Sequence, residues 1–294
     1  MTKVWFITGS SRGLGRALTE AVLANGDRVA ATARNPEQLQ DLVQQYPDRL
    51  YPVRLDVTKH DEIYQAVRNV VAHFGKIDVL VNNAGFGITG AAEAFTDEQV
   101  RSQLNTNLYA PIEVTRAVLP YMRKQRSGHI LQISSIGGRI GNPGLTMYQA
   151  AKFGLSGFSE ALAKEVAPLG IRVTCVEPGG FRTDWASASM SYAPHVEGYE
   201  TTVGFMATRF KGDGFIPVGD PKKAAKVMIE LVAGPTAPVH LVLGSEAAGF
   251  LKHADKQRQA EFEQWMPVTL STDHDDSENF LESDAAKALM GMTK

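Results

Sequence analysis

The chain has 294 residues, 44% of them hydrophobic and 21% charged, so one large globular domain is expected and a disordered or fibrous protein is excluded. Thirty basic and 32 acidic residues give a net charge of −2, which provides no electrostatic footprint for nucleic acid or an anionic membrane. Cys175 is the only cysteine, which excludes a disulfide framework and a cysteine-based zinc cluster within the chain. Neither a signal peptide nor an apolar run of the roughly 18 residues that a membrane span needs is apparent, so we expect a soluble, cytoplasmic protein.

Short apolar segments alternate with amphipathic ones along the first 245 residues. The pattern predicts strands at 3–8, 28–33, 50–55, 78–81, 129–133, 171–176 and 239–243. It predicts helices at 13–24, from 36, 58–74, 96–124, 146–168 and from 221. Asn35 and Asp220 precede prolines as helix caps, and Thr58 and Thr96 each begin the spacing of a capping box. This order predicts an α/β fold, a Rossmann-like doubly wound parallel sheet of about seven strands, flanked by helices in one domain over residues 1–245.

A glycine cluster directly follows the first predicted strand. Gly9, Gly13 and Gly15 in the segment TGSSRGLG permit a tight turn and a close approach of backbone N–H groups to a phosphate. The next helix would add its positive N-terminal dipole. A purely structural loop is the alternative, but the position after the first strand of a doubly wound pattern favours nucleotide binding.

The GxxxGxG spacing, led by Thr8, resembles the short-chain dehydrogenase/reductase family. Other motifs of that family follow in order and on the expected elements, and they are Asn82-Asn83-Ala84-Gly85, Asn107, Ser135, Tyr148 with Lys152, and Pro178-Gly179 with Thr183. The resemblance covers roughly residues 3–245. It implies a nicotinamide cofactor, oxidoreductase activity, and assembly as a homodimer or homotetramer.

Tyr148 and Lys152 lie one helical turn apart, so their side chains share a helix face, and Ser135 ends the fifth strand, where parallel sheets bind ligands. The resemblance implies that Tyr148 exchanges a proton with the substrate oxygen, that Ser135 holds that oxygen, and that Asn107 anchors a water linking Lys152 to solvent. Ser134 is the alternative to Ser135, which the family spacing favours. We expect the Lys152 cation and an oxidised nicotinamide to lower the pKa of Tyr148 toward neutrality.

The end of the second strand favours NADP(H) over NAD(H). No acid stands between Asp27 and Glu37 to accept from a ribose 2′-hydroxyl, whereas Arg34 and Arg12 could both bind a 2′-phosphate. Two solvated surface arginines are the alternative. The resemblance implies that Asp56 and Val57 contact the adenine. The other expected cofactor contacts are Gly9, Ser11, Gly13, Leu14, Gly15, Asn83, Ala84, Gly85, Tyr148, Lys152, Pro178, Gly179, Phe181 and Thr183. We expect no metal ion, and we interpret His274-Asp275-Asp276 as a solvated acidic tail.

Residues 181–218 form a long segment without a regular period, which predicts a mobile lid over an apolar pocket. The substrate contacts that we expect are Ser135, Tyr148, Ile136, Leu145 and Trp185. The substrate would be a lipophilic ketone, aldehyde or alcohol, and the loop and chain length resemble the steroid and retinol dehydrogenase branch of the family. Arg139 and Arg182 leave an acidic substrate open as an alternative.

Residues 246–294 form a predicted extension that begins with apolar residues at helical spacing and ends in a polar tail. Its helix would lie against the body of the protein or a partner subunit. The favoured function is hydride transfer between NADP(H) and a lipophilic carbonyl or alcohol. Two alternatives stay open, namely a binding protein that senses NADP without turnover, and an epimerase or dehydratase on the same fold.

Overall fold

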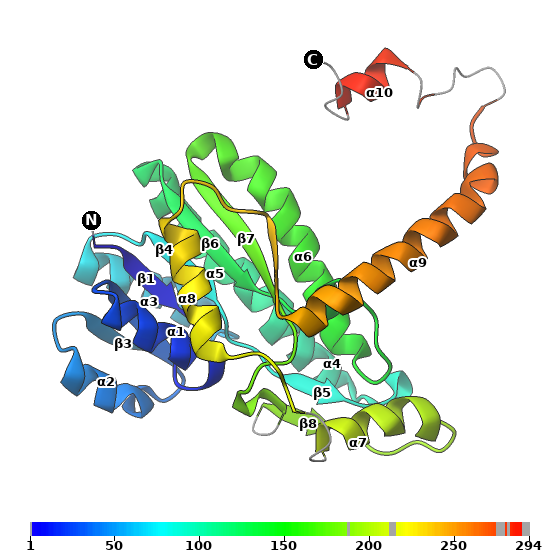
Figure 1. Cartoon of the computed structure of the whole chain (residues 1–294). Coiled ribbons are helices and arrows are strands. Elements are labelled where there is room, and N and C mark those ends of the chain that lie inside the picture. The colour runs from blue at the N-terminus through cyan, green and yellow to red at the C-terminus, as the bar shows by residue number, and fades with distance from the viewer. Residues whose placement is uncertain (1, 187–188, 212–215, 275–279, 281–282, 290–294) are drawn as a thin grey trace. The chain divides into compact units, whose positions relative to one another are not determined.

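A computed structural model describes residues 2–186, 189–211, 216–274, 280 and 283–289. The chain divides into two compact units, Met1–Leu251 and Lys252–Lys294. The first unit contains a seven-stranded sheet in the order β3-β2-β1-β4-β6-β7-β9, with every pairing parallel (Figure 1). Its strands are β1 (Val4–Ile7), β2 (Arg28–Ala33), β3 (Leu50–Arg54), β4 (Val79–Asn82), β6 (Gly128–Ile133), β7 (Ile171–Pro178) and β9 (His240–Leu243). The predicted doubly wound sheet is confirmed.

Helices cover both faces of the sheet, and neighbouring side chains of a strand enter opposite layers. Trp5 and Ile7 join the hydrophobic cluster beneath α1 (Gly13–Ala24), α2 (Gln40–Gln45) and α8 (Pro221–Ala233). Phe6, between them, joins the cluster beneath α3 (His60–Phe74), α5 (Ala110–Gln125) and α6 (Thr146–Val166). Both faces are therefore dry, which explains why the strands are almost wholly apolar.

Most of the predicted helix ends are confirmed. The side chains of Asn35 and Asp220 accept from backbone N–H groups of the helices that they precede, and Thr96 begins a complete capping box with Gln99 at α4 (Asp97–Leu104). The capping box predicted at Thr58 is wrong, because α3 begins at His60 and Lys59 precedes it without a side-chain cap. The Thr58 hydroxyl instead donates to a carboxylate oxygen of Asp56, 2.7 Å away.

The segment 181–218 is more regular than its sequence indicates. It contains β8 (Met190–Tyr192), which pairs in parallel with β5 (Gly87–Thr89), and α7 (Phe205–Lys211). The expectation of no regular structure is therefore wrong in part, since a three-residue strand is too short to show a period. The hydroxyl of Tyr199 also donates to Glu93, 2.8 Å away, so this segment contacts the chain that follows β5.

The sheet has its topological switch point between β1 and β4. From this point the chain order runs outward to β2 and β3 on one side and to β6, β7 and β9 on the other. The segments that follow β1 and β4 leave the same edge of the sheet, which is where open parallel sheets bind ligands.

The C-terminal part is helical, as predicted. It comprises α9 (Ser245–Leu270) and α10 (Asp284–Leu289). Within α9 Ala247 is buried, whereas Phe262 and Trp265 are half-exposed. Across the described residues, no helix combines the length and the apolar character required to cross a bilayer.

Candidate active site

Two loops meet at the switch point through the side chains of Thr8 and Asn83. The Thr8 hydroxyl accepts from the backbone N–H groups of Asn83 (2.9 Å) and Ala84 (3.1 Å). The amide group of Asn83 donates back to the carbonyl oxygens of Thr8 and Gly9, each 3.0 Å away. Because these bonds run in both directions, the loops after β1 and β4 form one braced unit.

The glycines of the first loop are required by this close approach. Gly9 has φ +68°, and a Cβ on it would lie 2.9 Å from the Cα of Ala84. A Cβ on Gly15 would collide with the Asn83 amide and the carbonyl oxygen of Gly9. Gly13 has φ +56°, and its Cβ position would lie 3.6 Å from Cβ of Thr183, so the segment after β7 reaches this loop.

The N-terminus of α1 suits an anionic group. Its N-cap residue, Arg12, makes no side-chain capping bond, and its first turn contains no acidic residue. Its helix dipole and backbone N–H groups are therefore directed at the end of the glycine loop, to which Ser11 and Leu14 also belong. The fit of this loop to a dinucleotide pyrophosphate is good on these grounds.

The two arginines predicted from the sequence to bind a 2′-phosphate are both exposed. Arg12 precedes α1, and Arg34 directly follows β2. Asp56, after β3, has Arg34 as a charged neighbour. Burial alone would raise the pKa of Asp56, but hydrogen bonds from Thr58 and the Arg34 charge bring that pKa below its usual value. Val57, beside it, is half-buried against the cluster under α3.

Ser135, Tyr148 and Lys152 come together beyond the end of β6. The Ser135 hydroxyl is a hydrogen-bond partner of the Tyr148 hydroxyl, and both Tyr148 and Lys152 are buried. The Lys152 ammonium donates to the carbonyl oxygen of Ile133 (2.8 Å) and lies 5.8 Å from the centre of the Tyr148 ring. Ser134, the alternative to Ser135, instead bonds the carbonyl oxygen of Lys152 and the hydroxyl of Ser156.

The structure contradicts one part of the expectation for Tyr148, because Lys152 by itself does not lower the pKa of this phenol. Burial raises the pKa of Tyr148 to about 12, and the bond to Ser135 offsets this only in part. Burial also lowers the pKa of Lys152 to about 8, although the nearby Cys175 raises it slightly. The reason is geometric, because the ammonium is directed at a backbone carbonyl and not at the phenol oxygen. Near neutral pH the structure therefore contains a neutral phenol beside a mostly protonated lysine.

Asn107 lies in a π-helical turn, Asn105–Tyr109, between α4 and α5. Its side-chain amide donates to the carbonyl oxygen of Phe86 (2.7 Å) and accepts from the Phe86 N–H (3.1 Å). A π turn inserted between α-helices is frequently a mark of a functional site. A Cβ on Gly85 would lie 2.8 Å from the Asn107 oxygen, so the glycine that ends the NNAG motif makes room for this amide.

The segment after β7 returns to the site. The N–H of Gly179 donates to Leu243 (3.0 Å), and Phe181 forms a parallel bridge with Gly219, whereas Pro178 ends the strand. Beyond Thr183, the indole of Trp185 lies against the Tyr148 ring, and Phe210 of α7 meets that indole edge-on with ring centroids 6.1 Å apart.

The remaining predicted substrate residues lie in the turn after β6 and immediately before α6. Ile136 directly follows Ser135 and is half-buried, and Leu145 is buried immediately before α6. Arg139 pairs with the buried carboxylate of Glu177, and Arg182 donates to the carbonyl oxygen of Pro217, so both arginines have partners within the protein. Of the segment His274-Asp275-Asp276, the two aspartates lie outside the described residues.

Comparison with known proteins identifies the family. The short chain dehydrogenase family model matches residues 3–192. The chain belongs to the short-chain dehydrogenase family. Oxidoreductase BOA17 of Botryotinia fuckeliana is 45% identical over 92% of this chain and 100% of its own length. The crystal structure of a short-chain dehydrogenase from Streptomyces avermitilis, 40% identical, has a TM-score of 0.88 over 93% of this chain and 99% of its own.

Solved structures that this chain resembles contain either NADP or NADH. A metagenomic short-chain oxidoreductase, 27% identical, is in complex with NADP, with a TM-score of 0.65 over 82% of this chain and 96% of its own. A 3-ketoacyl-(acyl-carrier-protein) reductase from Brucella melitensis, 25% identical, is complexed with NADH, with a TM-score of 0.68 over 82% and 96%. Family membership thus leaves the choice of cofactor to the residues of this chain.

The sequence pattern of this short-chain dehydrogenase does not indicate that Gln103 contacts the backbone of the candidate active site. Its side chain donates to the carbonyl oxygen of Phe86 (2.8 Å) and accepts from the N–H of Ile88 (2.9 Å), beside the amide of Asn107. A glutamine in a short polar helix has the pattern of a solvated residue, yet Gln103 is fully buried. The two amides together hold the backbone that follows the NNAG motif.

Proposed function

We propose that this short-chain dehydrogenase transfers a hydride between NADP(H) and a lipophilic ketone, aldehyde or alcohol. The observation that carries the proposal is the buried group of Ser135, Tyr148 and Lys152 at the carboxyl edge of a parallel sheet. At the same edge of the sheet, the glycine loop packs closely against Asn83 and Ala84 and leads into the N-terminus of α1. A binding protein without turnover has no need for a buried phenol and ammonium at this edge.

In carbonyl reduction, the Tyr148 hydroxyl is the proton donor and the Ser135 hydroxyl holds the same carbonyl oxygen by a hydrogen bond. The raised pKa of Tyr148 keeps the phenol protonated at neutral pH, as a donor requires. The Lys152 ammonium stabilises negative charge that develops on the phenol oxygen, and Asn107 anchors a water that connects Lys152 to solvent. The cofactor, when bound, supplies the hydride and carries a positive ring in its oxidised form. In alcohol oxidation the same residues act in reverse.

The cofactor would be NADP(H), bound along the loops after β1, β2, β3, β4 and β7. Arg12 and Arg34 are exposed cations without an intervening acid at the end of β2, which suits a 2′-phosphate. Asp56, whose pKa the nearby Arg34 charge helps to lower, would contact the adenine, as the family resemblance implies. The residues that would hold the rest of the cofactor are Gly9, Ser11, Gly13, Leu14, Gly15, Val57, Asn83, Ala84, Gly85, Tyr148, Lys152, Pro178, Gly179, Phe181 and Thr183.

The substrate would be lipophilic, because the indole of Trp185 lies against the reactive phenol and the ring of Phe210 lies against that indole. Met190 and Trp185 both approach Gly87, where a Cβ would lie 2.9 Å from the terminal methyl of Met190 and 3.1 Å from the indole. Ser135, Ile136 and Leu145 complete the expected substrate contacts. We further propose that residues 181–218 form a lid, with the pairing of β5 and β8 and the Tyr199–Glu93 bond as its closed contacts.

A panel of carbonyl compounds tests the proposal. Acetone, acetophenone and 4-phenyl-2-butanone would each be assayed with NADPH and with NADH, and oxidation of the cofactor would be followed by its absorbance. We expect turnover with NADPH that increases with the apolar area of the ketone, at about 25 cal/mol per Å² of buried surface. Tight NADPH binding with no turnover of any carbonyl compound or alcohol would favour a cofactor-sensing protein. Conversion of an alcohol or sugar derivative without net cofactor oxidation would favour an epimerase or dehydratase.

The proposal includes assembly as a homodimer or homotetramer, which the family resemblance implies. Sedimentation velocity at two protein concentrations would measure the mass. A monomer at both concentrations would contradict this part alone.

A further inference from the structure

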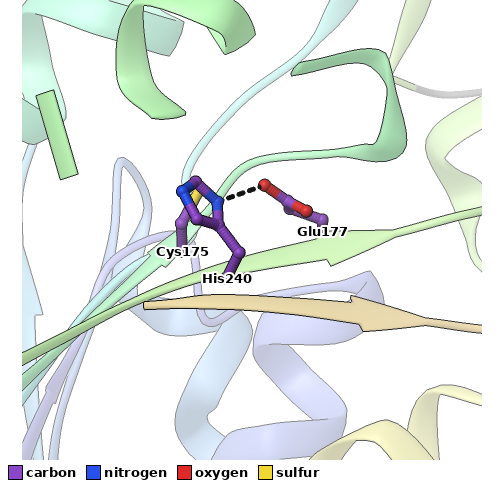
Figure 2. A group of neighbouring side chains, drawn as sticks. All are labelled: Cys175, Glu177 and His240. Atoms are coloured by element: carbon purple, nitrogen blue, oxygen red, sulfur yellow. Dashed lines mark hydrogen bonds and ion pairs between the residues drawn. The ribbon is translucent and has the colours of Figure 1, made fainter. Parts of the chain in front are cut away.

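A fully buried carboxylate, Glu177, lies at the carboxyl end of β7 outside the group of Ser135, Tyr148 and Lys152. Its two oxygens have separate partners, since Arg139 donates to one (3.2 Å) and Nδ1 of His240 lies 2.7 Å from the other. Figure 2 shows the imidazole of His240, on β9, beside the carboxylate of Glu177, on the neighbouring strand β7. A buried anion with two partners of this kind is costly to leave unpaired, so its contacts are held firmly.

Cys175, Glu177 and His240 could reach one metal ion by distance, as their ligand atoms lie within 4.8 Å of one another. The charges around them argue for a different role. The Arg139 guanidinium already neutralises Glu177, and burial raises the pKa of the Cys175 thiol, so a cation would have to displace a cation and a proton. Glu160 of α6 lies 3.8 Å from Nε2 of His240, and the Lys152 ammonium is a charged neighbour of Cys175. The cluster is therefore a network of ion pairs and hydrogen bonds in which Arg139 neutralises Glu177.

Arg139 connects this network to Ser135 through one short turn. The Ser135 hydroxyl accepts from the N–H of Gly137 (3.0 Å), and its carbonyl oxygen accepts from Gly138 (2.8 Å). The N–H of Arg139 then donates to Ile136 (2.9 Å), which closes the turn four residues after Ser135. A displacement of Arg139 is thus transmitted to the serine by consecutive hydrogen bonds.

The turn is confined from the other side by α6. A Cβ on Gly138 would lie only 2.6–2.8 Å from the hydroxyls of Ser134 and Ser156 and the carbonyl oxygen of Lys152. The turn is therefore pressed against the helix that bears Tyr148, and the Arg139–Glu177 pair restrains it on the sheet side.

We propose that Glu177 is a positioning residue, which through Arg139 fixes the turn after β6 and so aims the Ser135 hydroxyl at the substrate oxygen. The inference rests on the proposed function, in that Ser135 must act on that oxygen. Because a displacement of about 1 Å in a catalytic group can lower the rate by up to about 100-fold, loss of the tether affects kcat before it affects cofactor binding.

The test compares Glu177→Gln, which keeps the shape of the side chain and removes its charge, with His240→Gln, which removes the other partner and leaves the tether. For reduction of 4-phenyl-2-butanone by NADPH, we expect Glu177→Gln to lower kcat about tenfold, in the range that misplacement produces, with KM for NADPH changed less than about twofold. His240→Gln should keep kcat within about threefold of wild type. Equal losses in both variants would overturn the proposal, because the network would then serve general stability.

Ser135→Ala separates the inference from the proposed function. If this variant reduces the ketone as fast as wild type, the proposed role of Ser135 fails. If it is slow, adding Glu177→Gln should lower kcat by less than about twofold more, since the misplaced group is already absent. A further tenfold loss in the double variant would contradict positioning through Ser135.

Hydrogen exchange at the turn after β6 gives a readout that needs no substrate, so it also applies to a variant whose activity is too low to measure. The amides of Gly137 and Gly138, which bond Ser135, should exchange at least about tenfold faster in Glu177→Gln and in Arg139→Gln than in His240→Gln. Arg139→Gln releases the same tether from the turn side and leaves Glu177 with His240. Unchanged exchange in both tether variants would overturn the proposal.

Discussion

The indole ring of Trp185 lies against the phenol ring of Tyr148, with ring centroids 5.4 Å apart and planes inclined by 58°. The aromatic wall of the site is thus in direct contact with the proposed proton donor. The contact crosses from the segment after β7 to the helix α6, so it would join the proposed apolar pocket to the proposed proton donor.

Trp185→Ala should weaken binding of bulky ketones selectively. Loss of an aromatic contact of about 1.5 kcal/mol would raise KM for 4-phenyl-2-butanone roughly tenfold and leave KM for acetone within about twofold. Trp265→Ala is the matched control, because Trp265 is half-exposed in the second unit. Steady-state kinetics on both ketones measures the effect, and equal changes for acetone and the aryl ketone would contradict the proposed apolar wall.

Gly15→Ala should impair cofactor binding through the braced loops. Its Cβ would strike the Asn83 amide and the Gly9 carbonyl oxygen, which pushes the loops after β1 and β4 apart. We expect the Kd for NADPH, measured by fluorescence, to rise at least about tenfold, as for the loss of about one charge-assisted contact. Gly157→Ala on α6 is the control, since that glycine is exposed and its Cβ would meet open space. Equal Kd values for the two variants would show that the loop tolerates the methyl group.

Arg34→Ser and Arg12→Ser should each weaken NADPH and leave NADH nearly unaffected. A charge-assisted contact to a 2′-phosphate is worth about 1.5–3 kcal/mol, so a rise in Kd of tenfold or more per arginine is expected. Arg68→Ser on the surface of α3 removes the same charge elsewhere and controls for general electrostatics. Titration of each variant with NADPH and with NADH measures both Kd values. A wild-type protein that binds NADH more tightly than NADPH would refute the proposed 2′-phosphate contacts.

Lys152 predicts a pH dependence of stability. Burial lowers its pKa from 10.5 to about 8, so between these values the unfolded chain binds more protons at this residue than the folded protein. The free energy of unfolding should therefore rise with pH in this window. The cost of burying the charged Lys152 side chain is largest below about pH 8. Relative to Lys152→Met, wild type should gain about 2 kcal/mol between pH 7 and about pH 10.

Urea unfolding at both pH values measures this gain. Lys164→Met, an exposed lysine on the same helix, should show no such pH-dependent difference. If the free energy of unfolding of wild type, measured relative to Lys152→Met, rose with pH no more than it does relative to Lys164→Met, burial of the Lys152 ammonium would not destabilise the folded protein. Comparison stops near pH 10, because the raised pKa of Tyr148 acts with the opposite sign above it.

The sheet was predictable from sequence because burial on both faces makes most of its strands, which are four to eight residues long, apolar runs between helices. β5 and β8 were not, since each has three residues and its partner lies about a hundred positions away. The cap at Thr58 failed because Asp56, two residues earlier, competes for the same hydroxyl.

Within the site, motif spacing placed Tyr148, Lys152 and Ser135 on neighbouring elements. Glu177 gave no signal, because its partners Arg139 and His240 lie 38 and 63 positions away, and a strand-end glutamate has the pattern of a solvated residue. The direction of the Tyr148 pKa shift was also beyond the sequence, since it depends first on the burial of the phenol and then on Lys152 donating to the carbonyl oxygen of Ile133.

The central claim is that the Tyr148 hydroxyl transfers the proton in a NADPH-dependent carbonyl reduction. The most direct measurement is single-turnover oxidation of bound NADPH by 4-phenyl-2-butanone in wild type and in Tyr148→Phe, with Tyr121→Phe as the control. Removal of the hydroxyl alone should slow the step by at least about 100-fold, the usual cost of losing a general acid, with the Kd for NADPH unchanged. Tyr121→Phe should match wild type. A Tyr148→Phe variant that oxidises NADPH at a near wild-type rate would contradict the account.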